Sequence, residues 1–247
     1  SYYGKATEIL KKDTEYADKV LNARKRLVPS QVGKDSTLQE WMEDFGQLED
    51  KHRHFSHMYG LFPGNVLSTA KTPELIDPIK AVLEQRGDGG TGFSRAWKMA
   101  LWARLSDGDR ANSIYKGYLQ EQCYLSLFAK CYTPLQVDGT LGVTAAISEM
   151  LVQSHEDVIQ LLPALPKEWN SGKFYGVCTR GAFELNLEWE NGVTKKVEIL
   201  SKAGKNCIIS ANNTVKVFSN GNQVQIKNKN GYIEFPTEKG QMYKLEY

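Results

Sequence analysis

The hydrophobic residues follow two different periods along the chain, and the first is helical. Up to about residue 160, apolar side chains recur three or four positions apart, which is the spacing of one buried helix face. The segment 92–105 is apolar on nearly every face, as is typical of a helix covered on all sides. The pattern predicts about six helices, over residues 2–11, 17–28, 73–83, 92–105, 111–119 and 143–151.

Past "LLPALPKEW" the period changes to two. Phe183, Leu185, Leu187 and Trp189 alternate with polar residues, and "ENG" at 190–192 is a hairpin signal. Short strands between turns rich in asparagine and glycine are predicted at 183–189, through 197–199, and at 207–210, 214–218, 223–227, 232–235 and 242–245. We therefore predict helices first and a small antiparallel β-sandwich after them, as domains 1–165 and 166–247 with a boundary near Leu165.

Composition narrows the class of protein without naming it. The 247 residues are 41% hydrophobic, which is enough for one or two real cores, and 31 basic against 29 acidic residues give a formal charge of only +2. This balance predicts no nucleic-acid partner and no membrane partner, and the longest apolar runs are too short to span a bilayer. The four cysteines contain no CxxC pair, so we expect neither a zinc ribbon nor a thioredoxin-type site. We expect no cofactor.

The stretch "HRHFSHMYGLFPGN", residues 52–65, holds three of the four histidines. A metal site at His52, His54 and His57 is one interpretation, but Arg53 would place a permanent cation beside the ion. Neutral sugar recognition is the better one, because a guanidinium and imidazole N–H groups donate to hydroxyls while nearby aromatic rings offer an apolar face. Histidines satisfied by backbone carbonyls remain the alternative, with His52 or His57 as the candidates.

Three other stretches could carry chemistry. In "LQEWMEDF", Glu40, Glu43 and Asp44 would be paired carboxylates on a helix, against the alternative of a solvated face. "RGDGGTGFS" at 86–94 lacks the ending of a phosphate-binding loop, and a helix-to-helix connection is the simpler interpretation. Asp138 in "LQVDGTLG" either caps a helix or supplies an anionic carboxylate that activates water.

Five stretches occur in one order: "LQEWMEDF", "HRHFSHMYGLFPGN", "RGDGGTGFSRAWKMALWARLSDGDRA", "LQVDGTLG" and "AAISEMLVQSHEDVIQLLPALPKEW". Together they resemble the C-terminal half of family 95 glycoside hydrolases, which are α-L-fucosidases with some α-L-galactosidases. The resemblance covers nearly the whole chain, most closely 38–110 and 136–190. It is specific because several long motifs share the same order.

This resemblance implies half of an (α/α)6 barrel followed by a β-sandwich. The implied reaction is inverting hydrolysis of an α-L-fucosidic bond, in which a glutamic acid protonates the leaving oxygen while water attacks from the opposite face. Asp138 matches the aspartate that assists the water, and Arg53 with His54 looks like the pair that grips the sugar hydroxyls. The sequence departs from the family pattern at Phe93, Thr140 and Leu141. Because these departures change the shape of the pocket, the resemblance leaves the choice of substrate open.

The resemblance places the general acid and the water-holding asparagines before the region that matches Ser1. We therefore expect this chain to be a portion of a larger enzyme, to be inactive alone and to self-associate through exposed barrel helices. A periplasmic or extracellular location is expected from the resemblance. The alternative function is a carbohydrate-binding or structural module without catalysis, in which Arg53, His54 and Trp97 bind glycan.

Overall fold

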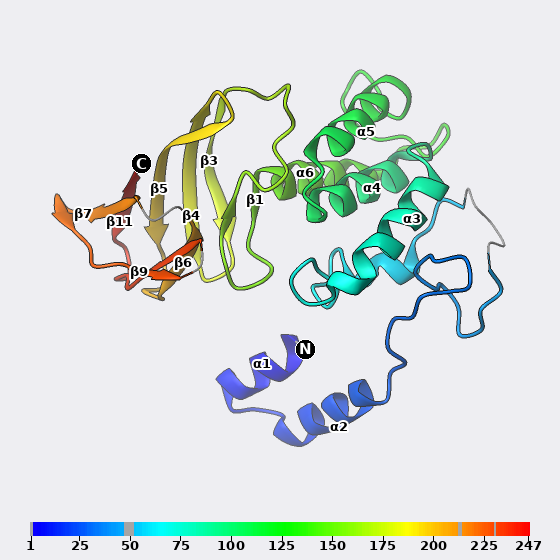
Figure 1. Cartoon of the computed structure of the whole chain (residues 1–247), viewed down its shortest axis with the longest axis horizontal. Helices are drawn as coiled ribbons and strands as arrows, with labels where there is room; N and C mark the ends of the chain where they lie inside the picture. Colours follow the sequence, from blue (N-terminus) through cyan, green and yellow to red (C-terminus); the bar gives the residue numbers. More distant parts are fainter. Residues whose placement is uncertain (1, 47–51, 212–213, 230) are drawn as a thin grey trace.

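The computed structural model describes residues 2–46, 52–211, 214–229 and 231–247, and it divides the chain into a helical part and a β part (Figure 1). The described helical part holds six α-helices, as predicted: α1 (Tyr2–Leu10), α2 (Thr14–Lys25), α3 (Ile76–Arg86), α4 (Gly92–Arg104), α5 (Gly108–Glu121) and α6 (Val137–Leu151). Two short 3-10 turns, η1 (Ser56–Gly60) and η2 (Pro73–Leu75), precede α3. Among the described residues, no helix is both long and apolar enough to cross a membrane.

The first residues of two helices, α3 and α6, differ from the prediction. Pro73 starts η2, and α3 begins only at Ile76. Pro78 is the third residue of α3, where its missing N–H has no partner to lose, so it does not bend the helix. The last helix begins at Val137 instead of 143, so Asp138 lies inside it.

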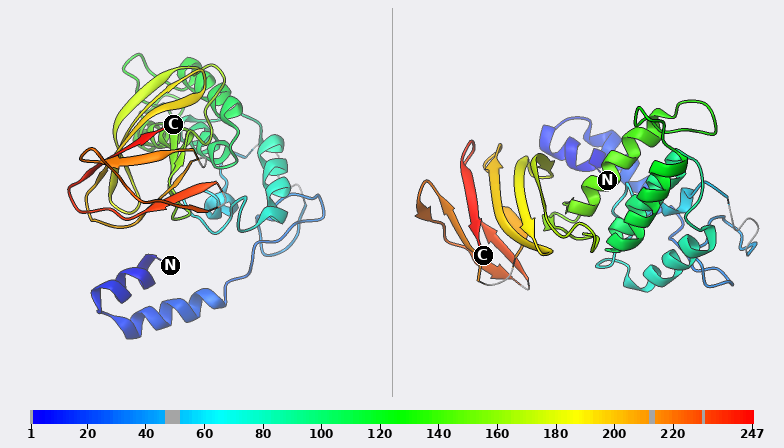
Figure 2. Two further views of the ribbon diagram at one scale, coloured as in Figure 1. Left: turned by 60° about the vertical axis from the view of Figure 1, so that its left-hand side comes forward. Right: turned by 90° about the horizontal axis from the view of Figure 1, so that it is seen from above.

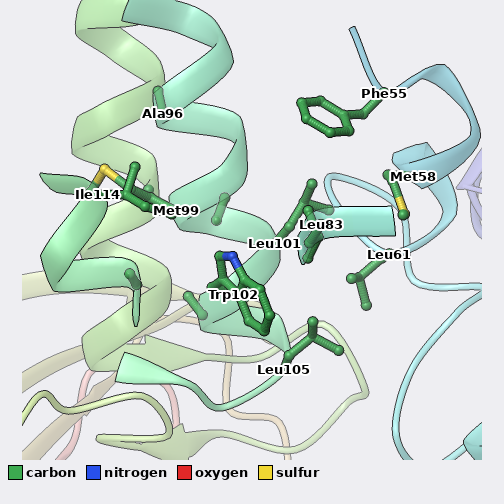
Figure 3. Close-up of a cluster of buried hydrophobic side chains, with 14 of the residues drawn as sticks. Phe55, Met58, Leu61, Leu83, Ala96, Met99, Leu101, Trp102, Leu105 and Ile114 are labelled. Carbon is green, nitrogen blue, oxygen red and sulfur yellow. The ribbon is translucent and has the colours of Figure 1, made fainter. Parts of the chain in front are cut away.

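The helical core is centred on α4. Eleven of its thirteen residues are buried, because α5 and α6 pack along it and side chains of α3 join the same core (Figure 1). Figure 3 shows the side chains of α4 meeting those of the 55–61 segment and of α3. The core's largest fully buried side chains come from all these elements: Phe55, Met58, Leu61, Ile79, Leu83, Met99, Leu101, Ile114, Tyr118 and Met150.

The hairpin of α1 and α2 stands apart from this core (Figure 1; Figure 2, left). Of the stripe that the sequence suggested for its second helix, only Ala17 is buried, while Leu27 is 71% exposed and lies beyond the end of α2. The two helices pack chiefly on each other, and an ion pair of 3.9 Å joins Lys5 to Asp157. The amphipathic pattern is therefore real, but its apolar face is largely uncovered here.

The β part is an antiparallel sandwich of two sheets, as predicted. The larger has the strand order β3-β4-β5-β11-β7-β8, and the smaller β6-β10-β9. Their inner faces share one core, with Leu185 and Val197 from the larger sheet and Ile209 and Ile233 from the smaller. The strands are β3 (Gly172–Thr179), β4 (Phe183–Glu190), β5 (Val193–Ser201), β6 (Cys207–Ser210), β7 (Lys216–Ser219), β8 (Asn222–Gln223), β9 (Lys227–Lys229), β10 (Tyr232–Phe235) and β11 (Met242–Glu246).

A short hairpin, β1 (Val152–Gln153) with β2 (Gln160–Leu161), connects the two parts. The following residues serve both cores, because Ala164 packs among the helices whereas Leu165 packs against the sandwich. The side chain of Gln153 donates to the carbonyl of Ala103 at 2.8 Å, which ties this connection to the end of α4. The boundary predicted near Leu165 falls in this shared segment.

Candidate functional site

The N-terminal ends of α4 and α6 lie against each other. The side chain of Gln136, just before α6, accepts the backbone N–H of Phe93 at 2.9 Å. A Cβ at Gly139 would lie 2.8 Å from the Cβ of Ala129 and 2.9 Å from the nitrogen of Phe93, so glycine is needed for this approach. Both helices therefore direct their unpaired N–H groups and positive dipole ends to the same end of the core.

Asp138 is the second residue of α6, and its side chain is exposed at this end. It does not cap the helix, since Gln136 occupies the cap position; its Oδ1 accepts the N–H of Gly139 at 3.0 Å. Asp138 is thus an accessible carboxylate at the N-terminal ends of the paired helices.

The residues from His52 to His54 cross the same end with their carbonyl groups held by side chains. The Nη1 of Arg86, the last residue of α3, donates to the carbonyl oxygens of His52 at 2.9 Å and His54 at 3.1 Å. The hydroxyl of Ser94 in α4 donates to the carbonyl of Arg53 at 3.0 Å. With all three carbonyls held, the side chains of Arg53 and His54 are exposed and free to meet a ligand.

A buried polar cluster of Glu40, His57 and Arg86 packs against the 52–54 segment. Arg86 is 8% exposed and also donates through Nη2 to Glu40 at 2.7 Å, which neutralises both charges. The Nδ1 of His57 lies 3.8 Å from the same carboxylate oxygen. Burial lowers the pKa of His57 to about 4, an effect that Glu40 opposes and Arg86 adds to, so the imidazole is neutral near pH 7.

Trp97 forms part of the wall behind these residues. Its indole N–H donates to the carbonyl of Phe62 at 2.9 Å, and its ring meets those of Phe55 and Phe93 with centroids 6.0 and 5.7 Å apart. The side chain is half-buried against the helical core. Because the indole N–H already donates to Phe62, Trp97 can contact a ligand only through the exposed part of its ring.

The structure does not support the other sites that the sequence suggested. Within the part of the chain that the structure describes, no three histidine, cysteine or acidic side chains form a group able to hold a metal ion. The segment 41–46 is not helical, and Glu40 is committed to Arg86, so the acidic residues there are not paired for acid/base work. The loop after α3 connects two helices, with Asp88 held by Arg110 at 2.9 Å.

The fold thus brings together residues far apart in the sequence. The segments that hold Asp138 and Arg53 both contact the first turn of α4: Gly139 packs against Phe93, and the carbonyl of Arg53 accepts from Ser94. The sequence did not single out the roles of Arg86 and Ser94. Both act through contacts to backbone atoms more than thirty positions away, and such contacts leave no local sequence pattern.

Both parts of the chain match models of one protein family. Residues 1–151 match the model of the glycosyl hydrolase family 95 catalytic domain, and residues 153–245 match the model of the glycoside hydrolase family 95 C-terminal domain. A solved structure of Streptomyces avermitilis alpha-L-rhamnosidase complexed with L-rhamnose aligns over 99% of this chain and 25% of its own, with 11% identity and a TM-score of 0.49.

Two named relatives are similar to this chain over most of its length. "Alpha-L-fucosidase 2" of Arabidopsis thaliana is 39% identical over 76% of this chain and 24% of its own length. "Probable alpha-fucosidase A" of Aspergillus niger is 28% identical over 72% of this chain and 25% of its own length. The chain thus spans about a quarter of the length of these relatives. With both domain models matched in order and a catalytic-domain match over more than half its residues, the chain belongs to glycosyl hydrolase family 95.

Proposed function

We propose that this chain contributes part of the active site of an inverting α-L-fucosidase that acts on fucosylated glycans. Asp138 accepts a proton from the attacking water, Arg53 and His54 donate to the hydroxyls of the sugar, and Trp97 forms one wall. The proposal also places the general acid outside this chain. Support comes from the family and from relatives of which this chain spans only about a quarter.

One observation supports the proposal: the segments that hold Asp138 and Arg53 both contact the first turn of α4, through Gly139 against Phe93 and through the Arg53 carbonyl on Ser94. Inverting hydrolysis needs one carboxylate that stays ionised to activate water and a second, protonated one on the opposite face of the sugar. Asp138 is an exposed aspartate at the start of α6, within reach of solvent, which suits the water-activating role. Adjacent donors without a fixed negative charge suit a neutral sugar.

The direct test measures release of fucose from 2'-fucosyllactose by the full-length protein that contains this chain. Asp138→Asn is expected to abolish most of the activity, since an amide cannot take up the proton. Asp77→Asn is the matched control, because Asp77 is likewise an exposed aspartate at the second position of a helix. Equal activity of the two variants, or robust turnover by these 247 residues alone, would refute this division of the site.

Two finer points belong to the same proposal. Specificity for L-fucose over L-galactose is proposed from the named relatives, and the ratio of activities on the two aryl glycosides tests it. Action outside the cytoplasm, in the periplasm or beyond, is proposed from the family's glycan substrates, and cell fractionation tests it. Binding of L-fucose by the full-length protein without any hydrolysis would favour a carbohydrate-binding module instead.

A further inference from the structure

Lys98 is a buried lysine in the middle of α4, and the reaction proposed above does not use it. Its exposed fraction is only 2%, in a helix with eleven buried residues. Lysine is almost never fully buried unless its ammonium has partners, because burying a charge costs free energy. The groups around this ammonium therefore indicate what the residue does.

The ammonium of Lys98 holds the end of α3 and the loop that follows it. Its Nζ donates to the carbonyl oxygens of Gly89 at 2.6 Å and Arg86 at 3.4 Å. The last carbonyl groups of a helix lack partners within the helix and attract a nearby cation. Because Gly89 and Gly90 are exposed, water competes for the loop carbonyls when the ammonium is absent.

The same loop packs on the hydroxyl that holds Arg53. A Cβ at Gly90 would lie 2.8 Å from the Oγ of Ser94, so the backbone of Gly90 lies directly against this hydroxyl. The hydroxyl of Ser94 in turn donates to the carbonyl of Arg53 at 3.0 Å. A shift of the loop would therefore change the surroundings of the group that fixes the Arg53 backbone.

The ammonium also contacts the ring of Phe55. The Nζ of Lys98 lies 5.2 Å from the centroid of this ring, and the guanidinium carbon of Arg86 lies 5.6 Å from it. Phe55 is fully buried in the helical core and directly follows His54 in the chain (Figure 3). A cation over an aromatic ring is attracted to it, and more strongly where water is excluded.

The buried charge itself works against the stability of the fold. Burial lowers the pKa of the Lys98 ammonium to about 8, an effect that Asp88 opposes and that Arg95 and Arg86 reinforce. The carboxylate of Asp88 pairs directly with Arg110, at 2.9 Å. The ammonium is therefore still mainly charged at pH 7, although burial disfavours the charged form. An apolar side chain of similar volume would avoid this cost.

We propose that Lys98 is a positioning residue: its ammonium holds the end of α3 and the following loop in the arrangement that presents Arg53 and His54. It acts through Arg86 and Ser94 and touches no ligand itself. The inference rests on the proposed function for the identity of the ligand. Buried charges that disfavour stability are typical of functional sites, where geometry matters more than stability.

The test is Lys98→Met in the full-length protein, because methionine has nearly the same length but neither a donor nor a charge. KM for an aryl fucoside is expected to rise roughly fivefold with little change in kcat, since displaced binding groups lose part of their contribution. Hydrogen–deuterium exchange is expected to become faster in two separate segments, 86–91 and 52–55. The melting temperature is expected to stay the same or rise, because the buried charge is gone.

Lys80→Met is the matched control, since Lys80 is exposed on α3 and the chemical change is the same. It is expected to leave KM and the exchange of both segments unchanged.

In an active enzyme, an unchanged KM or unchanged exchange in either segment of the Lys98→Met variant would overturn the proposal. A lower melting temperature of this variant would also overturn it, because a purely structural role predicts loss of stability. Faster exchange in both segments of a full-length protein that neither binds nor cleaves fucosides would refute the proposed function while supporting the positioning role of Lys98.

Discussion

Arg86→Lys separates the positioning of the candidate site from the general stability of the fold. The guanidinium of Arg86 makes three hydrogen bonds, to Glu40, His52 and His54 at 2.7, 2.9 and 3.1 Å. A lysine ammonium is a point charge that lacks the planar fork, so it can keep the bond to Glu40 but not both carbonyls. Losing two bonds at about 1 kcal/mol each lowers the free energy of unfolding by about 2 kcal/mol.

The matched control is Arg104→Lys at the opposite end of α4. Arg104 pairs with Glu149 at 2.6 Å and donates to the carbonyls of Leu61 and Gly64, both at 3.2 Å. The two arginines therefore have the same kinds of partner, one carboxylate and two backbone carbonyls, although Arg104 meets Glu149 through two hydrogen bonds. Both variants should lose similar stability in urea titrations. Only Arg86 holds the backbone that presents Arg53 and His54.

The assay is steady-state hydrolysis of an aryl fucoside by the full-length protein. Arg86→Lys is expected to raise KM roughly tenfold, because misplaced binding groups lose much of their contribution. Arg104→Lys is expected to leave KM unchanged. Equal KM values in the two variants, with equal loss of stability, would refute the claim that Arg86 positions the sugar-binding pair.

The remaining predictions concern the fold and its surfaces. The pKa of His57 is about 4 in the folded protein and 6.5 in the unfolded chain, so the unfolded state binds more protons between these pH values. The free energy of unfolding should therefore fall by roughly 3 kcal/mol as the pH drops from 6.5 to 4. Urea midpoints of His57→Gln that fall just as steeply with pH would contradict this. Gly139→Ala should cost about 2 kcal/mol despite its better helix propensity, since the new Cβ meets Phe93 and Ala129, and an unchanged melting temperature would contradict the close approach. Leu141, 66% exposed on α6, should drive self-association of the chain, and Leu141→Lys should shift light scattering toward a monomer; a monomeric unaltered chain would contradict it.

Periodic, locally determined elements were predictable from the sequence. The all-round apolar pattern of α4 matched its burial, and the alternation of β4 matched its inward and outward faces. β3 was missed because Gly176 adopts a positive φ and a register shift between Phe174 and Val177 interrupts the alternation. The stripe of α2 was recognised, but what covers such a stripe is set by packing and not by its own spacing.

The candidate site was predictable only in part, and for a similar reason. Asp138, Arg53 and His54 lie in distinctive motifs, and the structure brings the segments that hold Asp138 and Arg53 against the first turn of α4. The roles of Arg86 and Ser94 depend on hydrogen bonds to backbone carbonyls, which any residue can offer. Contacts of this kind are visible only once the chain is folded.

The crystal structure of the full-length Asp138→Asn protein with 2'-fucosyllactose bound would show directly whether these residues surround the sugar. We predict fucosyl hydroxyls within hydrogen-bond distance of Arg53 and His54, with the glycosidic carbon facing position 138. Electron density for the fucosyl unit elsewhere, with Arg53 and His54 making no contact to it, would contradict the account.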